Sequence, residues 1–350
     1  MAPKTYQAFR RTSGDFPRTI ELSSEDLPDD LDPTAVLIKI HAVSLNYRDV
    51  GMLVGNYPVQ VEEHGISASD CAAEVVKIGS AVKSFGIGDR VTVIFDTTNF
   101  TGTEDASMQA LGGDVPGVLR EFAVFDEKLL LRLPEHLTWE EGSVLSCAAL
   151  TAWTALNAPA SIGVARSALL QGTGGVSMCA LLICLAAGIQ PIITSSSDQK
   201  LDNIKRLNPE IRGINYKTTP DVAAEVARIT DGKGVDIVVN NTGPASILTD
   251  ISMLRARGGV VSLVGFLEGL AADWNPAALL GLMSKRASLK GIAVGSKADF
   301  LRMNEFLQEK QVRFSSTIDR VFPFLESKDA FDLLLSGGHV GKVVIKIGDS

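Results

Sequence analysis

Residues 167–197, SALLQGTGGVSMCALLICLAAGIQPIITSSS, form a stretch of thirty-one residues without one charged side chain. A membrane span needs about twenty apolar residues, so length alone would permit one. The internal pattern argues against it, because a three-glycine turn and a Gln-Pro pair both fall inside the stretch. We instead predict a buried strand at 167–171, a glycine turn at 172–177, a helix at 178–187 that Gly188 ends, and a second strand at 190–194.

The turn places Gly172, Gly174 and Ser177 at the three glycine positions of the dinucleotide-binding fingerprint. The first position needs a tight turn, the second needs no side chain toward the pyrophosphate, and the third needs close packing of helix on strand. Serine is small enough for the third position. The helix that follows offers N–H groups and a partial positive charge to a phosphate. We therefore expect a dinucleotide at Gly172, Thr173, Gly174, Gly175 and Val176; the plainer alternative is an ordinary glycine turn.

The composition describes an ordinary globular chain. At 350 residues, two domains are expected, and 45% hydrophobic with 21% charged residues is typical of a soluble protein. The net charge of −8 argues against nucleic acid or an anionic membrane surface as partners. The N-terminal sequence lacks the apolar core of a secretory signal, and the four cysteines show no CxxC spacing. We therefore expect a reducing, cytoplasmic location.

The rest of the chain divides into a strand-rich first third and an alternating region. Strands are predicted at 35–43, 72–78, 91–95 and 119–125, with a long polar segment at 96–117 that we interpret as a lid or a binding loop. A capping box at 138–141 predicts a helix that begins near Trp139. Strands at 214–216, 235–239, 259–264 and 288–294 then alternate with helices at 198–207, 221–230, 245–254 and 298–310, and the tail holds a helix at 328–335 and a strand at 342–347. Such alternation predicts a doubly wound parallel sheet.

Several short motifs occur in a fixed order along nearly the whole chain: SLNYRD at 44–49, GDRV at 88–91, CAALTAW at 147–153, QGTGGVS at 171–177, NYK at 215–217, GVD at 234–236 and GGHVGK at 337–342. On these motifs the sequence resembles the zinc-free branch of the medium-chain dehydrogenase/reductase superfamily, which includes quinone oxidoreductases, alkene reductases and alcohol dehydrogenase-like proteins. The resemblance implies an α/β protein. A GroES-like β-barrel domain would comprise 1–130 and 311–350, a Rossmann domain would comprise 131–310, and the active site would lie in the cleft between them.

Zinc alcohol dehydrogenases of this superfamily hold the catalytic metal with a Cys, a His and a second Cys. The resemblance places Asn46, Ser69 and Cys147 at those positions. One thiolate cannot build a site that needs three converging N or S ligands, and segment 96–117 has no cysteine for a structural zinc, so we expect no metal. Without a metal, hydrogen-bond donors must stabilise the oxyanion that hydride transfer creates, which favours substrates that delocalise its charge. We expect NADPH-dependent reduction of a conjugated C=C bond or a quinone in a small molecule.

The resemblance implies that Asn46 and Tyr47 face the nicotinamide, and it makes Arg48 and Thr151 further catalytic candidates. Each has a structural alternative: Asn46 shapes a turn, Tyr47 packs in the barrel, Arg48 pairs with Asp49, and Thr151 fills a helix. Two other functions stay open. One is a zinc-independent, NADP-dependent alcohol or ketone oxidoreductase, and the other is an NADPH-binding protein without turnover.

The second strand of the cofactor unit ends in Thr194-Ser-Ser-Ser197, where NAD-preferring sites place a carboxylate for the ribose 2′-hydroxyl. Ser195, Ser196 and Ser197 cannot repel a 2′-phosphate, and Lys200 adds a positive charge one helical turn later, so we predict NADPH. The competitor is Asp198, which would favour NADH as the ribose-binding carboxylate; we interpret it as the N-cap of its helix.

Other cofactor contacts follow from strand ends and from the resemblance. We expect them at Tyr216, Asn241, Thr242, Val264, Gly265, Phe266, Ala293, Val294, Gly295 and Lys342. A structural alternative for Lys342 is a plain surface lysine. Strand 288–294 is expected at an exposed sheet edge, where pairing with a second copy would give a homodimer.

Overall fold

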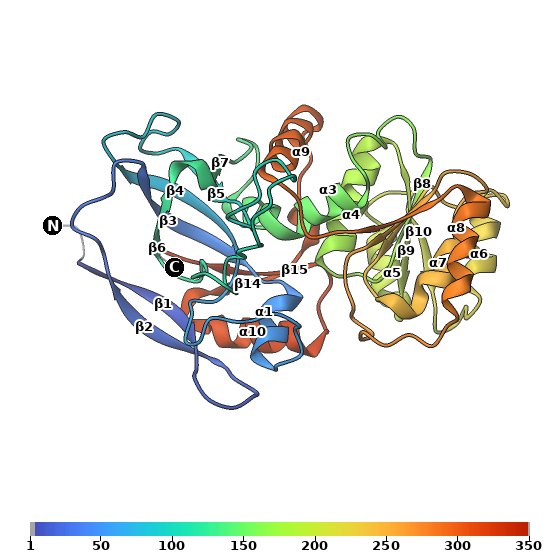
Figure 1. Ribbon diagram of the computed structural model, residues 1–350, viewed down its shortest axis with the longest axis horizontal. Helices are drawn as coiled ribbons and strands as arrows, with labels where there is room; N and C mark the ends of the chain where they lie inside the picture. The colour runs from blue at the N-terminus through green and yellow to red at the C-terminus, as the bar shows by residue number, and fades with distance from the viewer. Residues whose placement is uncertain (1–3, 349–350) are drawn as a thin grey trace. The chain divides into compact units, whose positions relative to one another are not determined.

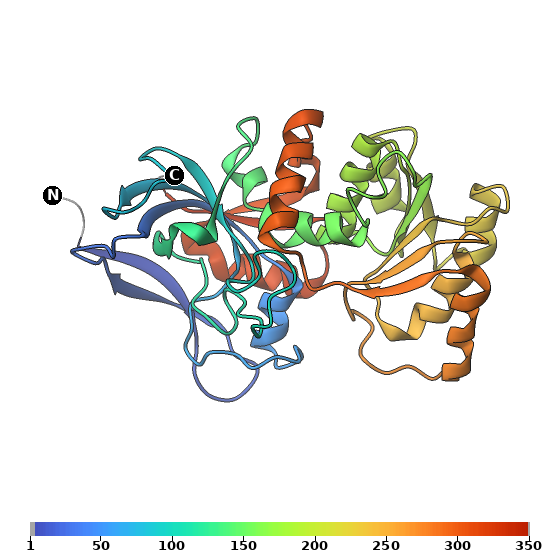
Figure 2. The same cartoon turned by 45° about the horizontal axis from the view of Figure 1, so that its top comes forward.

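The computed structural model describes residues 4–348, and the chain divides into two compact units, which Figures 1 and 2 show in colours that follow the chain. Unit 1 contains the residues up to Ala148 and those from Ser296 onward, and unit 2 is Ala149–Gly295. The expected boundaries, 130/131 and 310/311, differ from these because residues 131–148 and helix α9 (Lys297–Lys310) belong to unit 1. The backbone N–H of Lys297 donates to the Asn99 carbonyl at 3.0 Å, and the Asn304 amide donates to the Arg132 carbonyl at 2.9 Å.

Unit 1 is built on a mixed sheet in the order β14-β15-β3-β4-β5-β7, with β6 paired to β3 and a separate hairpin of β1 and β2. Its strands are β1 (Thr5–Arg11), β2 (Ile20–Asp26), β3 (Ala35–Ser44), β4 (Asp70–Ile78), β5 (Arg90–Val93), β6 (Phe122–Asp126), β7 (Leu130–Arg132), β14 (Ile318–Pro323) and β15 (Lys342–Lys346). Its other helices include α1 (Tyr47–Leu53), α2 (Trp139–Gly142) and α10 (Ser327–Ser336). The β1–β2 hairpin, α1 and β14 were not among the sequence-based expectations.

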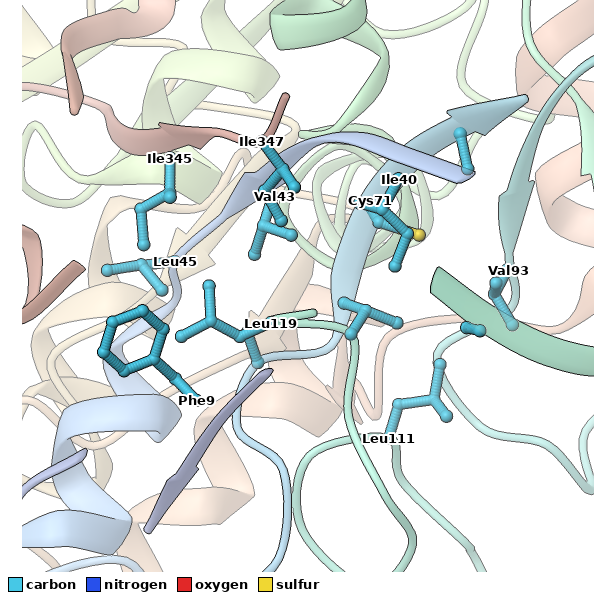
Figure 3. Close-up of a cluster of buried hydrophobic side chains, with 14 of the residues drawn as sticks. Phe9, Ile40, Val43, Leu45, Cys71, Val93, Leu111, Leu119, Ile345 and Ile347 are labelled. Atoms are coloured by element: carbon cyan, nitrogen blue, oxygen red, sulfur yellow. The ribbon is translucent and has the colours of Figure 1, made fainter. Parts of the chain in front are cut away.

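The core of unit 1 fixes three strand ends beside one another. Figure 3 shows Phe9, Ile40, Val43, Cys71 and Ile345 from four strands in a single buried cluster. In the strand register, Ser44 of β3 pairs with Asp70 of β4 on one side and with Val344 of β15 on the other. The residues at and just beyond these ends, near 46, 70 and 342, are therefore brought together although they are far apart in the sequence.

Unit 2 contains the predicted parallel sheet, in the order β10-β9-β8-β11-β12-β13, with every pair of neighbours parallel. Its strands are β8 (Ser167–Leu170), β9 (Gln190–Ser195), β10 (Arg212–Asn215), β11 (Ile237–Asn240), β12 (Val260–Leu263) and β13 (Ser288–Gly291). Its helices include α3 (Leu150–Ala155), α4 (Gly175–Ala187), α5 (Asp198–Lys205), α6 (Val222–Ile229), α7 (Ile247–Met253) and α8 (Leu280–Lys285). The strand order reverses between β8 and β11, which is the point where doubly wound sheets bind ligands.

Two local predictions need correction. The N-cap of α5 is Ser197, whose hydroxyl accepts from the backbone N–H of Lys200 at 3.4 Å, so our assignment of Asp198 as the cap was wrong. Asp198 is instead the first helical residue, where its carboxylate still interacts favourably with the helix dipole. Helix α4 begins at Gly175 rather than at 178, because Gly174 already serves as its N-cap. Within residues 4–348, no helix is long and apolar enough to cross a membrane.

Candidate functional site

In unit 2, most of the predicted cofactor residues lie just beyond the carboxyl ends of the parallel strands, which all point the same way. The turn 172–176 follows β8, Ser196 follows β9, Tyr216 follows β10, and Asn241 follows β11. Residues 264–266 follow β12 and residues 293–295 come after β13. Because these ends meet at one edge of the sheet, the structure brings most of the predicted unit 2 residues to that edge, while Thr151 lies in α3 and Lys200 in α5.

The glycine turn has room in front of it. Gly172 has φ +75°, a conformation that favours glycine, and its N–H donates to the Thr194 hydroxyl at 3.0 Å. A Cβ added to Gly172 or Gly174 would meet no atom within 4 Å. At Gly174, where φ is −79°, neither packing nor backbone strain therefore requires glycine. An open space at the N-terminus of a long helix suits the pyrophosphate for which the fingerprint selects glycine.

Ser177, at the third glycine position, joins the turn to the neighbouring strand by hydrogen bonds. Its hydroxyl donates to the Gln171 carbonyl at 2.8 Å and accepts from the Asn241 amide at 3.0 Å. The same Asn241 amide donates to the Gln171 carbonyl at 3.1 Å. Asn241 thereby links the ends of β8 and β11 at the point where the strand order reverses, and it holds the base of the glycine turn.

The buried carboxylate of Asp250 accepts several hydrogen bonds from this network. Asp250 accepts from the side-chain amides of Gln171 at 2.7 Å and Asn240 at 2.6 Å, and from the Ser246 hydroxyl at 3.0 Å. Burial raises the pKa of Asp250 to about 6, although these three donors oppose the rise. Gln171 also accepts from the Thr242 hydroxyl at 2.9 Å. Asp250 was not found from the sequence, because it lies inside α7 with no motif around it.

At the end of β9, the three serines differ in exposure. Ser195 is buried and its hydroxyl accepts from the Ser197 N–H at 3.2 Å, whereas Ser196 is exposed. Tyr216 is 41% exposed, with the Lys217 ammonium 5.9 Å from the centre of its ring. The exposed Tyr216 ring and the Lys217 ammonium beside it leave space for a bound nucleotide. The adenine and 2′-phosphate contacts themselves stay predictions.

A residue with a strained backbone follows β13, the last strand in the order of the sheet. Val294 has φ +59°, which is unusual for a β-branched side chain. Its carbonyl accepts from the Thr154 hydroxyl of α3, and a Cβ on Gly295 would lie 2.8 Å from Thr154 Cγ2. Thr151, on the same helix, is 4% exposed. Close packing around residues 294–295 maintains the strained backbone at Val294. Strained backbone of this kind is common at ligand-binding sites.

In unit 1, the catalytic candidates lie at the start of α1 and face different surroundings. Tyr47 is 43% exposed, so the alternative that it packs in the core is wrong. Arg48 is 6% exposed; it donates to the Leu111 carbonyl at 2.8 Å, and its nearest guanidinium nitrogen is 3.7 Å from the Asp49 carboxylate. The alternative of pairing between Arg48 and Asp49 is thus present in the structure. Asn46 is half-buried.

The side chain of Asn46 belongs to a closed ring of polar groups. The Lys342 ammonium donates to Asn46 Oδ1 at 2.6 Å, and Asn46 Nδ2 donates to the Ser69 hydroxyl at 3.4 Å. The Ser69 hydroxyl donates to Asp70 Oδ1 at 2.7 Å, and Asp70 Oδ2 is 3.9 Å from the ammonium. The Lys342 and Asp70 side chains are 2% and 0% exposed. The alternative of a surface lysine is therefore wrong, and the ammonium lies against Asn46, Asp70 and the Leu45 carbonyl.

Three titratable groups near this ring are shifted toward their neutral forms. Burial raises the pKa of the Cys147 thiol to about 12 and that of the Asp49 carboxyl to about 6. Burial also raises the pKa of Tyr57, which Arg48 opposes only in part. Tyr57 and Tyr47 flank Gly51, where an added Cβ would lie 3.3 Å and 3.7 Å from their rings. Sequence reasoning missed Tyr57, because only folding brings it beside Arg48.

Comparisons with known proteins agree with this architecture. The zinc-binding dehydrogenase family matches residues 175–309, and the alcohol dehydrogenase GroES-like domain family matches residues 32–135. A zinc-type alcohol dehydrogenase-like protein of Schizosaccharomyces pombe is 36% identical over 327 residues, which cover 92% of this chain and 93% of that protein. A structure from Sinorhizobium meliloti 1021, described as a candidate alcohol dehydrogenase, has a TM-score of 0.90 at 30% identity and covers 99% of this chain and 100% of its own. The chain belongs to the medium-chain dehydrogenase/reductase superfamily and is an oxidoreductase with a GroES-like and a Rossmann sheet, as the sequence predicted.

The names of the family and of the relative raise the question of zinc, and the side chains at the relevant positions do not fit it. Asn46 and Ser69 offer an amide and a hydroxyl, so of the three positions only Cys147 carries a side chain of the kind that zinc prefers. The Lys342 ammonium, 2.6 Å from Asn46 Oδ1, would also repel a divalent cation. Among residues 4–348, no three His, Cys, Asp or Glu side chains are grouped so that they could hold a metal ion.

Proposed function

We propose that this oxidoreductase uses NADPH to reduce conjugated C=C bonds or quinones and that it needs no zinc for turnover. The observation that carries the proposal is the ring around Asn46. By the resemblance, Asn46 and Ser69 of this ring stand at positions where zinc-dependent members of the superfamily hold their metal, so hydrogen bonds would perform the task of the metal. NADPH, when bound, would supply the hydride.

The ring suits substrates whose oxygen gains charge that a conjugated system can share. Hydride addition to the β-carbon of an enone, or to a quinone, develops an enolate or a phenolate oxygen. One or two fixed donors are enough to stabilise such an oxygen, whereas an alkoxide from a simple ketone keeps its charge localised. Asn46 Nδ2 is the donor that we assign to this oxygen, because its partner Oδ1 is already taken by Lys342.

A proton must reach the substrate after the hydride, and two tyrosines are available. Tyr47 is the candidate from the sequence and is 43% exposed. Tyr57 is half-buried, and although burial raises its pKa, Arg48 opposes this rise and would stabilise the phenolate left after donation. We assign proton donation to Tyr57, with Arg48 as its positively charged neighbour.

The preference for NADPH rests on the end of β9. Ser195, Ser196 and Ser197 carry no charge, and the exposed Ser196 leaves room for a 2′-phosphate. Since Asp198 is not the helix cap, its exposed carboxylate is the feature that would favour NADH. Catalytic efficiency with NADPH and NADH decides between them: we expect at least about a tenfold preference for NADPH, which corresponds to about 1.4 kcal/mol. A preference for NADH would assign the ribose contact to Asp198.

Steady-state assays with matched enones, quinones, saturated ketones and alcohols test the reaction. We expect turnover of the conjugated substrates in a zinc-free, chelator-treated preparation. Preference for a saturated ketone or an alcohol would instead support the alcohol/ketone oxidoreductase. NADPH binding without consumption on the whole panel would support a binding protein without turnover.

We also propose that the enzyme is a homodimer that pairs through β13. This strand is the last in the order of its sheet, and Ser288, Lys290 and Gly291 are exposed on it. Met283 of the neighbouring α8 is 75% exposed. Unpaired strand edges readily pair with a second copy by twofold symmetry. Light scattering of the intact protein and of a Leu289→Pro variant tests this: the variant should be monomeric, and a monomeric parent protein would refute the proposal.

A further inference from the structure

In the polar ring of unit 1, the chemistry of each side chain fixes which atom donates a hydrogen bond and which atom accepts it. A lysine ammonium has donors and no acceptor, so the atom of Asn46 that faces it at 2.6 Å must be the carbonyl oxygen. Amide orientation is ordinarily ambiguous, but here the ammonium settles it. The ammonium also donates to the Leu45 carbonyl at 2.7 Å, which fixes its own position.

The other side of the ring constrains the amide in the same sense. The Ser69 hydroxyl donates to the Asp70 carboxylate at 2.7 Å, so its oxygen is left to accept from Asn46 Nδ2 at 3.4 Å. Asp70 also accepts from the Cys147 N–H at 3.2 Å and neutralises the ammonium 3.9 Å away. Each member therefore holds its neighbour in one orientation, and the ring closes without an unpaired charge.

We propose that Lys342 is a positioning residue that turns the Asn46 amide so that it presents only N–H to a ligand. One Nδ2 hydrogen of Asn46 is used by Ser69, and the amide also bonds to the Asp70 carboxylate. The proposal assigns the remaining donor capacity of the half-buried amide to the ligand. The site then accepts ligands with a hydrogen-bond-accepting oxygen, above all an oxyanion, and rejects donor groups and metal ions. This inference rests on the proposed function for the identity of the ligand, and it gives Lys342 a role other than the cofactor contact expected from the sequence.

The probe for this role is 4-nitrophenol, whose anion is coloured, added to the intact protein in the presence of NADP⁺. A donor aimed at the phenol oxygen should lower the apparent pKa of the bound probe by about one unit, which the visible spectrum measures. Asn46→Asp, which replaces the donor by an acceptor, should abolish the shift. Lys342→Arg keeps a cation that can hold Oδ1 and should retain most of the shift.

Removal of Lys342 alone would leave Asp70 buried without its partner, so the main variant is Lys342→Met with Asp70→Asn, which removes both charges together. We expect it to fold and to lose the shift. Lys346→Met is the matched control, because Lys346 is an exposed lysine on the same strand, and it should keep the shift. When Asn46 is already replaced by alanine, Lys342→Met with Asp70→Asn should cause no further loss of the pKa shift, since Lys342 acts through Asn46.

The outcomes separate this inference from the proposed function. Three results would each overturn the role of Lys342. The first is a normal pKa shift of the probe in the folded double variant, and the second is a further loss of that shift in the Asn46→Ala background. The third is a wild-type protein that does not lower the pKa of the probe. The substrate panel, run on the same preparations, decides the reaction independently. A wild-type protein that ionises the probe but reduces nothing would refute the reductase and keep the inference.

Discussion

The two units hold their polar groups in opposite ways. In unit 2, the glycine turn leaves open space in front of Gly172 and Gly174, and the buried carboxylate of Asp250 accepts a hydrogen bond from Gln171 at the base of the turn. In unit 1, Lys342 and Asp70 are buried charges that close a ring around Asn46. An open turn with backbone donors suits a ligand that brings its own charge. A closed ring suits a task in which one amide must keep a single orientation.

The comparison predicts the largest effect at the open turn. Gly174→Asp keeps a good helix cap, so folding should be preserved, but its carboxylate would occupy the space assigned to the pyrophosphate. We expect NADPH affinity to fall by about 1000-fold or more, by steric exclusion together with charge repulsion. Isothermal titration calorimetry measures the loss.

Gly174→Asn is the matched control, because it has nearly the same shape, no charge and an equal capacity to cap the helix. It should weaken binding by about 30-fold, so that the difference between the two variants isolates the repulsion. Equal, unimpaired binding by both variants would mean that the space in front of Gly174 does not receive the phosphates.

The next effect concerns the two tyrosines of unit 1. Tyr57→Phe should lower kcat by about 100-fold with little change in KM, because general acid catalysis typically contributes that much. Tyr47→Phe is the matched variant, and we expect it to change kcat by less than about fivefold. Stopped-flow single turnovers with a quinone or an enone measure the chemical step directly. If Tyr47→Phe has the larger effect, the assignment from the sequence replaces Tyr57.

The same contrast explains what the sequence could predict. The parallel sheet and the turn at 172–176 are encoded locally, by an uncharged run and by glycine spacing, so both were found. Asn46 was predicted from a motif, but its ring also contains Ser69, Asp70 and Lys342, and no local pattern in the sequence indicates that these side chains meet. Tyr57 and Asp250 lie in no motif. We assign them roles because of their burial, which only the assembled fold supplies.

Asp250 gives a prediction of intermediate size, in the pH dependence of stability. Its pKa is about 6 in the folded protein against an ordinary value of 3.8, so the folded state binds the proton more tightly. The stabilisation from this proton is fully present below about pH 4 and is lost as the pH rises through about 6. Relative to Asp250→Asn, the wild-type protein should therefore gain roughly 2 kcal/mol when the pH falls from about 7 to about 4. Urea denaturation of both proteins across this range measures it.

A control of opposite sign comes from Asp299. Burial there raises the carboxyl pKa, but hydrogen bonds from Ser296 and Arg302 outweigh it, so the net shift is downward. The stabilisation by its ionised form is thus lost only below the ordinary pKa. The difference between the wild-type protein and Asp299→Asn should stay flat from about pH 7 to about 5. A flat profile for Asp250→Asn as well would show that Asp250 is not buried as the structure has it.

The smallest effect tests the strain at Val294. A β-branched residue at φ +59° costs of the order of 1–3 kcal/mol, and Val294→Gly relieves this cost while adding about 1 kcal/mol of unfolded-state entropy. We expect a gain in stability of up to about 1 kcal/mol together with a weakening of NADPH binding by about threefold, because the fixed backbone beside the predicted cofactor site is loosened. Ala293→Gly, at the preceding residue, has no such strain to relieve and should only destabilise. Thermal denaturation with and without NADPH compares the two variants. If the Val294→Gly and Ala293→Gly variants are destabilised equally, the backbone at Val294 is not strained.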